Sequence, residues 1–168
     1  MKHLRRLPHL ILACSLASIA GFAASSAWAQ TLDTSFSCSD IRKEDGDGER
    51  VNYADQGKIK LDGDKIKAFQ WESSLFRSTH GFDCSIDEND GAQAEVTDKG
   101  WRITLKNAMA ARAARGYDTE RGNVCSIRLE RNGDELQIKP TCAVLCGSRN
   151  NFTALTVNTK TGSCHYDE

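Results

Sequence analysis

Apolar and polar residues alternate along most of the chain beyond residue 30, as they do in β-strands that bury one face. The clearest example is segment 125–140, in which two alternating runs flank the dipeptide Asn132-Gly133. Asn-Gly is the strongest short-range signal for a two-residue hairpin turn. With this pair at the tip of the turn, the pattern predicts a hairpin in which Leu129 lies opposite Leu136.

A second hairpin is predicted around Asp62-Gly63, where the alternation on either side places Ile59 opposite Ile66. Further alternating runs follow, separated by turn signals at intervals of roughly 8–12 residues. They cover residues 82–86, 92–96, 101–105, 153–157 and 164–166. Trp71 and Trp101 each lie within an alternating run and are therefore expected in the core.

These signals predict a mainly β fold, an antiparallel sandwich or small barrel stapled by three disulfides. One short helix is predicted over Ala108–Arg115, with Asn107 as its N-cap and Gly116 directly after its end. Because no linker, repeat or low-complexity tract interrupts the pattern, residues 30–168 are expected to form a single domain.

The first 29 residues follow a different pattern. The first ten carry three Lys and Arg and no acid, an uncharged stretch runs from Leu10 to Ala27, and the segment closes with Ala27-Trp28-Ala29. This order predicts a secretory signal peptide that is cleaved after Ala29. A retained membrane anchor is the alternative, but the apolar run is short and interrupted by serines. Lipid attachment at Cys14 would leave too short an apolar core before it.

Removal of residues 1–29 changes the charge balance of the chain. The segment holds three of the 22 Lys and Arg and none of the 23 Asp and Glu, so the remaining 139 residues carry a net charge of −4. A mildly acidic domain has no global field that would gather nucleic acid or anionic lipid. We therefore expect neither a nucleic-acid partner nor, after cleavage, a membrane partner.

The cysteine count predicts disulfides, because an even number in an exported chain is typical of a covalent framework. Six cysteines follow the signal segment: Cys38, Cys84, Cys125, Cys142, Cys146 and Cys164. The order of the predicted strands favours a sequential scheme among the 15 possible pairings. Its pairs are Cys38–Cys84, Cys125–Cys142 and Cys146–Cys164. A zinc site is the alternative, but the close pair Cys142 and Cys146 has no second close pair to complete it.

Arginines gather between residues 112 and 131, where acids are interleaved with them, and a loop from Gly116 to Gly122 lies among them. Guanidinium groups bind carboxylates through paired hydrogen bonds, and tyrosine rings stack on apolar faces. The sequence therefore predicts a ligand- or partner-binding surface. Its residues are Arg112, Arg115, Tyr117, Asp118, Arg121 and Arg149. The alternative is a surface loop whose charges pair with one another.

No catalytic, metal or cofactor set is predicted. The chain lacks a G-x-S-x-G elbow, and the two histidines beyond residue 30, His80 and His165, belong to different segments. The acidic loop Asp45–Glu49 does not match an EF-hand, since Lys43 and Ala54 would occupy its first and last ligand positions. No Asp or Glu is expected in an apolar setting that would raise its pKa for glycosidase chemistry.

Three runs carry a resemblance: Gly-Phe-Asp-Cys-Ser-Ile-Asp at 81–87, Cys-x3-Cys-Gly-Ser-Arg-x2-Phe at 142–152, and Gly-x-Cys-x-Tyr at 162–166. They resemble small uncharacterised exported proteins of Gram-negative bacteria, which implies no particular activity. The size, the export signal and the early Cys38 are also similar to periplasmic lysozyme inhibitors of the small β-barrel type. The loop with serine and lysine that those inhibitors insert into the lysozyme cleft has no match here.

The sequence thus favours a periplasmic or secreted, non-enzymatic binding or inhibitor module. Its partner is expected to be an envelope or extracellular protein or glycan. Two alternatives stay open: a hydrolase whose site is assembled only in three dimensions, and a structural protein of the envelope.

Overall fold

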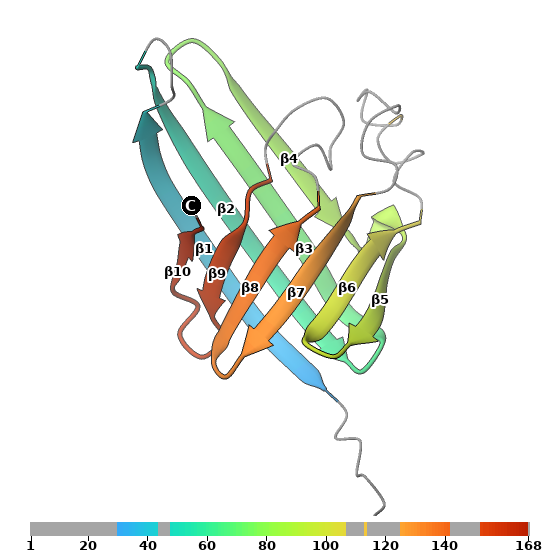
Figure 1. Cartoon of the computed structure of the whole chain (residues 1–168). Coiled ribbons are helices and arrows are strands. Elements are labelled where there is room, and N and C mark those ends of the chain that lie inside the picture. Colours follow the sequence, from blue (N-terminus) through green and yellow to red (C-terminus); the bar gives the residue numbers. More distant parts are fainter. Residues whose placement is uncertain (1–29, 44–47, 107–112, 114–124, 142–151, 168) are drawn as a thin grey trace, which may run out of the picture.

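The computed structural model describes residues 30–43, 48–106, 113, 125–141 and 152–167. These residues form two antiparallel sheets (Figure 1). The first sheet has the order β1 (Thr31–Lys43), β2 (Arg50–Asp62), β3 (Lys65–Phe76), β4 (Gly81–Asp87). The second consists of β5 (Ala92–Thr97), β6 (Gly100–Leu105), β7 (Ser126–Asn132), β8 (Glu135–Pro140), β9 (Leu155–Asn158) and β10 (Cys164–Tyr166), which are neighbours in chain order.

The prediction of a mainly β, antiparallel fold is therefore confirmed. Within the described ranges Ala113, which belongs to the predicted helix, is helical, and the short 3-10 helix η1 (Glu88–Asp90) carries the chain from the first sheet to the second. Its N-cap Asp87 accepts a hydrogen bond from the amide of Asn89 at 2.7 Å. All but one residue of the predicted helix Ala108–Arg115 lies outside the described residues.

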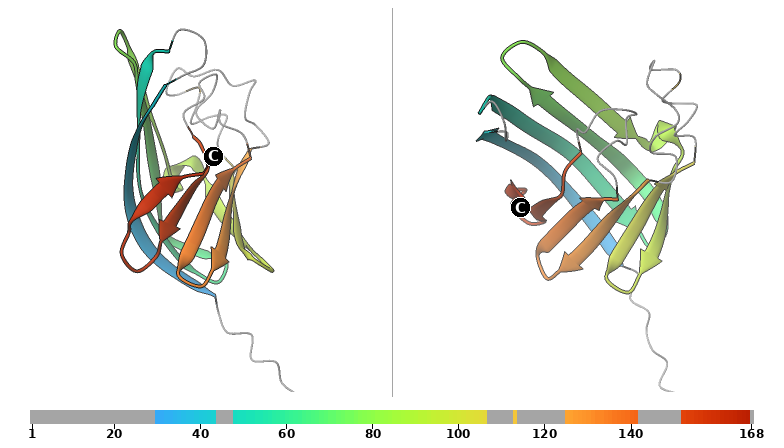
Figure 2. Two further views of the ribbon diagram at one scale, coloured as in Figure 1. Left: turned by 60° about the vertical axis from the view of Figure 1, so that its left-hand side comes forward. Right: turned by 45° about the horizontal axis from the view of Figure 1, so that its top comes forward.

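The two sheets share one core. Figure 2 shows the long strands of the first sheet curving behind the shorter strands of the second. The alternating side chains that point between the sheets form a single apolar cluster with members from both. Trp71 of β3 and Trp101 of β6 are 0% and 1% exposed, so the prediction that both are core residues is confirmed. Burial of each side chain contributes on the order of 2–3 kcal/mol.

The predicted register of the β7–β8 hairpin is wrong, because the turn lies one residue later in the chain than predicted. Leu129 pairs with Ile138 instead of Leu136, because Gly133 and Asp134 form the turn. Gly133 has a φ of +62°, whereas no described residue other than glycine has a positive φ. A glycine at the first central position with a normal second residue is the pattern of a type II′ turn, which suits the twist of a hairpin as well as type I′ does.

The β2–β3 hairpin differs from its prediction in the same way. Gly63, with a φ of +59°, takes the first central position, and Leu61 pairs with Ile66. A bulge after Lys60 then places Ile59 opposite Phe69 instead of Ile66. The displaced turn changes each partner by two positions, which keeps apolar side chains on their face, and the bulge adds the third position between Ile66 and Phe69.

The sequential disulfide scheme is also wrong. Cys38 of β1 is bonded to Cys164 of β10, with a Cα–Cα distance of 5.6 Å, which excludes both Cys38–Cys84 and Cys146–Cys164. The pairing follows the sheet topology, which returns the last strand to the side of the first. Cys84 and Cys125 are disulfide-bonded as well. Cys142, the partner predicted for Cys125, lies outside the described residues.

A buried carboxylate also connects the last strand, β10, to the first sheet. Asp55 of β2 is 2% exposed, and its two carboxylate oxygens accept hydrogen bonds from Trp71 Nε1 at 2.7 Å and from the hydroxyl of Tyr166 at 2.8 Å. The guanidinium group of Arg42 lies 5.0 Å from the ring centre of Tyr166, a cation–π distance. The network connects β1, β2, β3 and β10.

This network corrects the expectation that no acid has a raised pKa. Burial raises the pKa of Asp55, and the hydrogen bonds from Tyr166, Trp71 and Ser73 oppose that rise without cancelling it. Burial and the neighbouring Asp55 carboxylate also raise the pKa of Tyr166 above its ordinary value. Asp55 occupies the same inward phase of β2 as Val51 and Ile59, which explains its burial.

We expect the variant Asp55→Asn to reveal this pKa in the pH dependence of stability. Above the ordinary carboxyl pKa of 3.8, native Asp55 retains a proton that the unfolded chain has released, so the free energy of unfolding falls as pH rises through this window. Relative to Asp55→Asn, the wild type should therefore lose stability between acid and neutral pH. Urea unfolding at several pH values measures the difference. A constant difference would contradict the assignment, and exposed Asp64→Asn controls for loss of an acid.

The Cys38–Cys164 bond gives a second expectation. It closes a separation of 126 residues, for which the chain-entropy model gives up to about 5 kcal/mol, and less where other disulfides already shorten the loop. The double variant Cys38→Ser/Cys164→Ser should therefore unfold at a clearly lower urea concentration. Peptide mapping of the oxidised wild type without reduction should yield a cross-linked peptide pair that contains both cysteines. Recovery of Cys38 linked to Cys84 would contradict the pairing.

Candidate functional site

The outer face of the six-stranded sheet carries a cationic surface on β6, β7 and β8. The alternation that sends Ile103 and Leu129 into the core leaves Arg102 and Arg128 pointing outward. The register pairs Arg102 with Arg128, and Arg128 in turn with Lys139. These three residues form one row across three strands, here named the cationic row.

The members of the cationic row differ in their partners. Arg102 Nη1 lies 3.9 Å from the carboxylate of Glu95 on β5. Lys139 Nζ lies 3.3 Å from a carboxylate oxygen of Glu130 and 2.7 Å from the side-chain oxygen of Gln137. Arg128, between them, has an exposed side chain and forms no hydrogen bond or ion pair with any residue of the described segments.

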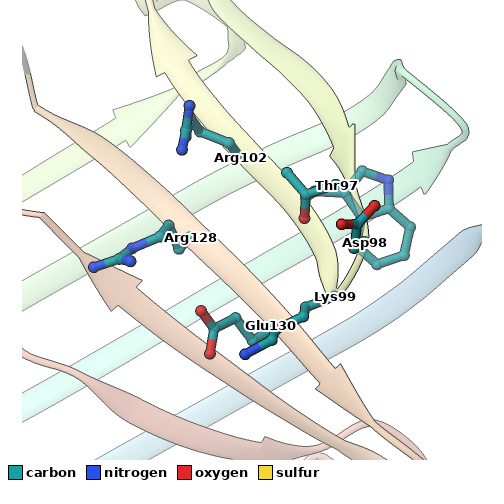
Figure 3. A pocket seen from close by; sticks show the side chains of 7 residues that line it. Thr97, Asp98, Lys99, Arg102, Arg128 and Glu130 are labelled. Atoms are coloured by element: carbon teal, nitrogen blue, oxygen red, sulfur yellow. The ribbon is translucent and has the colours of Figure 1, made fainter.

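A surface hollow of about 260 Å³ lies beside this row. Figure 3 shows Arg102 and Arg128 on neighbouring strands above it, and Lys99 extending from the β5–β6 turn toward Glu130. The hollow is lined by Thr97, Asp98, Lys99, Trp101, Arg102, Arg128 and Glu130. Three of these side chains are cationic and two are acidic, so the hollow has the opposite sign to the net charge of the chain after residue 29.

The turn that carries Lys99 depends on a glycine. Gly100 has a φ of +150°, and a Cβ at this position would lie 2.1 Å from the carbonyl oxygen of Leu129. The carbonyl oxygen of Lys99 accepts a hydrogen bond of 2.8 Å from the amide of Arg131. Gly100 thus permits the β5–β6 turn to lie directly against β7, which fixes the position of Lys99 relative to the row.

This arrangement suits recognition of an anion. Guanidinium groups form two parallel hydrogen bonds with a carboxylate or phosphate, and the donors of Arg128 are not engaged by any described residue. Like charges directly opposite each other on neighbouring strands destabilise a sheet, so the Arg102–Arg128 pair has an energetic cost in the free protein. A bound anion between the two side chains would remove that repulsion. Among the described residues, no group of three or more His, Cys, Asp or Glu is placed to hold a metal ion.

The binding surface predicted from sequence cannot be compared with this site. Its six residues, Arg112, Arg115, Tyr117, Asp118, Arg121 and Arg149, all lie outside the described residues. Arg128 belongs to the arginine-rich stretch 112–131, whereas Lys99 and Arg102 lie outside it and are not among the residues predicted from sequence. Arg102 has an outward-facing position in an alternating strand, and Lys99 lies in the turn before that strand. These positions indicate a site only once β7 is known to lie beside β6.

Comparisons with known proteins give no further assignment. No family model matches the chain, and no similar protein was found among curated proteins or solved structures. The resemblance to exported proteins of Gram-negative bacteria and to lysozyme inhibitors therefore stays a prediction. In the part of the chain that the structure describes, no helix has the length and hydropathy needed to cross a membrane.

The repulsion within the cationic row can be measured through stability. We expect Arg128→Thr to raise the free energy of unfolding by about 0.5 kcal/mol at low ionic strength, because it removes a like charge opposite Arg102. Added salt should shrink the gain. Lys58→Thr is the matched control, since the residues paired with Lys58 are the uncharged Ser35 and Gln70. A loss of stability specific to Arg128→Thr would show that Arg128 has a structural role instead.

Proposed function

We propose that this protein is an exported, non-enzymatic binding or inhibitor module that recognises an anionic group of an envelope or extracellular partner through Arg102 and Arg128. The observation that carries the proposal is the guanidinium group of Arg128, which has no partner in the part of the chain that the structure describes and which the sheet register places opposite a second arginine. A binding surface on hydrogen-bonded strands is held in place before the ligand arrives, which lowers the cost of association.

Export is part of the proposal. Residues 1–29 act as a signal peptide, and the remaining chain folds in the periplasm or outside the cell as a sandwich with three disulfides. The Cys38–Cys164 bond supports this assignment, because structural disulfides form and persist in oxidising compartments. The bonded states of Cys84 and Cys125 are in keeping with a framework of three bonds.

Binding is favoured over hydrolysis by the position of the one described carboxyl group whose pKa is raised. A general acid must reach its substrate, but Asp55 is 2% exposed and both of its oxygens are engaged by core donors. Its hydrogen bonds give it a structural role. Arg102 and Arg128 of the cationic row, in contrast, are exposed, and Arg128 forms no hydrogen bond with any described residue.

The experiment uses the processed, oxidised protein on a column of immobilised poly-glutamate. Because the chain after residue 29 has a net charge of −4, retention on an anionic matrix requires a local cationic site. We expect the wild type to be retained at low salt, and Arg102→Ala/Arg128→Ala to elute much earlier. Lys58→Ala/Lys67→Ala removes the same charge from exposed positions on the first sheet and should elute with the wild type.

Two outcomes would contradict the proposal. The first is a wild type that is not retained, or a control variant that elutes as early as the double arginine variant. The second is turnover of peptidoglycan, ester or peptide substrates by the oxidised protein, which would favour the hydrolase alternative. A phosphate-bearing matrix run in parallel distinguishes a preference for phosphate from one for carboxylate.

A further inference from the structure

Gln30 directly precedes β1 and is the first residue of the chain that the proposed signal cleavage would leave. Its carbonyl oxygen accepts a hydrogen bond of 2.9 Å from the amide of Gly63 in the β2–β3 turn. The next carbonyl oxygen, that of Thr31, accepts one of 2.9 Å from Arg131 Nη1. The backbone is therefore held from the carbonyl group of Gln30 onward.

The remaining groups of Gln30 are available for chemistry. Gln30 is exposed, and the bond from Gly63 is the one hydrogen bond that it forms with the described residues. No residue of the described ranges engages its backbone nitrogen or its side-chain amide. A reaction between those two groups would break no hydrogen bond and would leave the anchored carbonyl group where it is.

We propose that Gln30 is a modification site at which the new N-terminus cyclises to pyroglutamate. This inference rests on the signal cleavage that is part of the proposed function. Once the Ala29–Gln30 bond is cut, the α-amino nitrogen attacks Cδ of its own side chain and forms an N–Cδ bond. The Cδ–Nε2 bond breaks, a proton passes from the amine to Nε2, and one ammonia leaves. The step needs no oxidant, reductant or second substrate.

The surroundings of Gln30 favour the product. Gln30 lines a second hollow, of about 380 Å³, together with Lys99 and Arg131, while Asp98 is its one acidic member. An α-ammonium group here would add a third positive charge beside two cations. The lactam is neutral, so cyclisation removes that charge. It also removes the free amine that aminopeptidases require, which protects the start of β1.

The test uses the full-length protein, produced with its leader in a Gram-negative host and purified without reduction. We expect the N-terminal tryptic peptide, residues 30–42 after reduction of Cys38, to be lighter than its sequence mass by one ammonia. Edman sequencing of the intact protein should be blocked until pyroglutamyl aminopeptidase has removed the first residue. Assignment of the mass loss to this peptide excludes succinimide formation at Asn132-Gly133.

The variant Gln30→Ala separates cyclisation from cleavage, because alanine cannot form the lactam. It should give a readable N-terminus that begins with the substituted alanine and shows no loss of ammonia. A wild type with a free Gln30 amine, beside a correctly processed Gln30→Ala, would overturn the cyclisation and leave the export proposal intact. An N-terminus elsewhere in both proteins would overturn the cyclisation together with the cleavage site.

Discussion

The carboxylate of Asp55 is the contact on which the arrangement of the strands depends. It lies in the core, where an unpaired charge would be very costly, and it is tolerated because Trp71 and Tyr166 both donate to it. Those donors belong to β3 and to β10, so the hydrogen bonds of one buried group hold the last strand against the first sheet. A shift of β10 by one residue would leave the carboxylate without one of its donors. Polar requirements of this kind specify a single packing where apolar contacts alone would allow several.

The six-stranded sheet, which contributes Tyr166 of β10 to this network, presents the cationic row on its outer face. Successive side chains of a strand point to opposite sides, so the rigidity of the core is transmitted directly to the outward-facing Arg102 and Arg128. Two guanidinium groups held side by side oppose folding slightly and favour an anionic ligand. Natural proteins commonly accept such a cost at binding sites, because selection acts on function once stability is sufficient.

The alternation in the sequence predicted most of the strands, their buried faces and the core positions of Trp71 and Trp101, but no strand was predicted over β1 or the first half of β2. It could not predict the hairpin registers, because registers that differ by two positions bury the same side chains and only the conformation of Gly63 or Gly133 decides between them. The alternation also could not predict which strands and cysteines pair across long sequence separations. The Cys38–Cys164 bond and the burial of Asp55 both require knowledge that β10 lies beside β1. The juxtaposition of Arg102 and Arg128 likewise depends on β7 following β6 in space, across a connection of 20 residues.

The bond between the first and last strands has a consequence for biosynthesis. Synthesis proceeds from the N-terminus, so Cys38 is made 126 residues before its partner and meets Cys84 first. Any bond that Cys38 forms during that interval is non-native and must be undone by thiol–disulfide exchange before the Cys38–Cys164 bond can form. Maturation is therefore completed only when the final strand arrives, and a product truncated before residue 164 leaves Cys38 without its native partner. The native Cys38–Cys164 bond can therefore form only in a polypeptide that has been synthesised through residue 164.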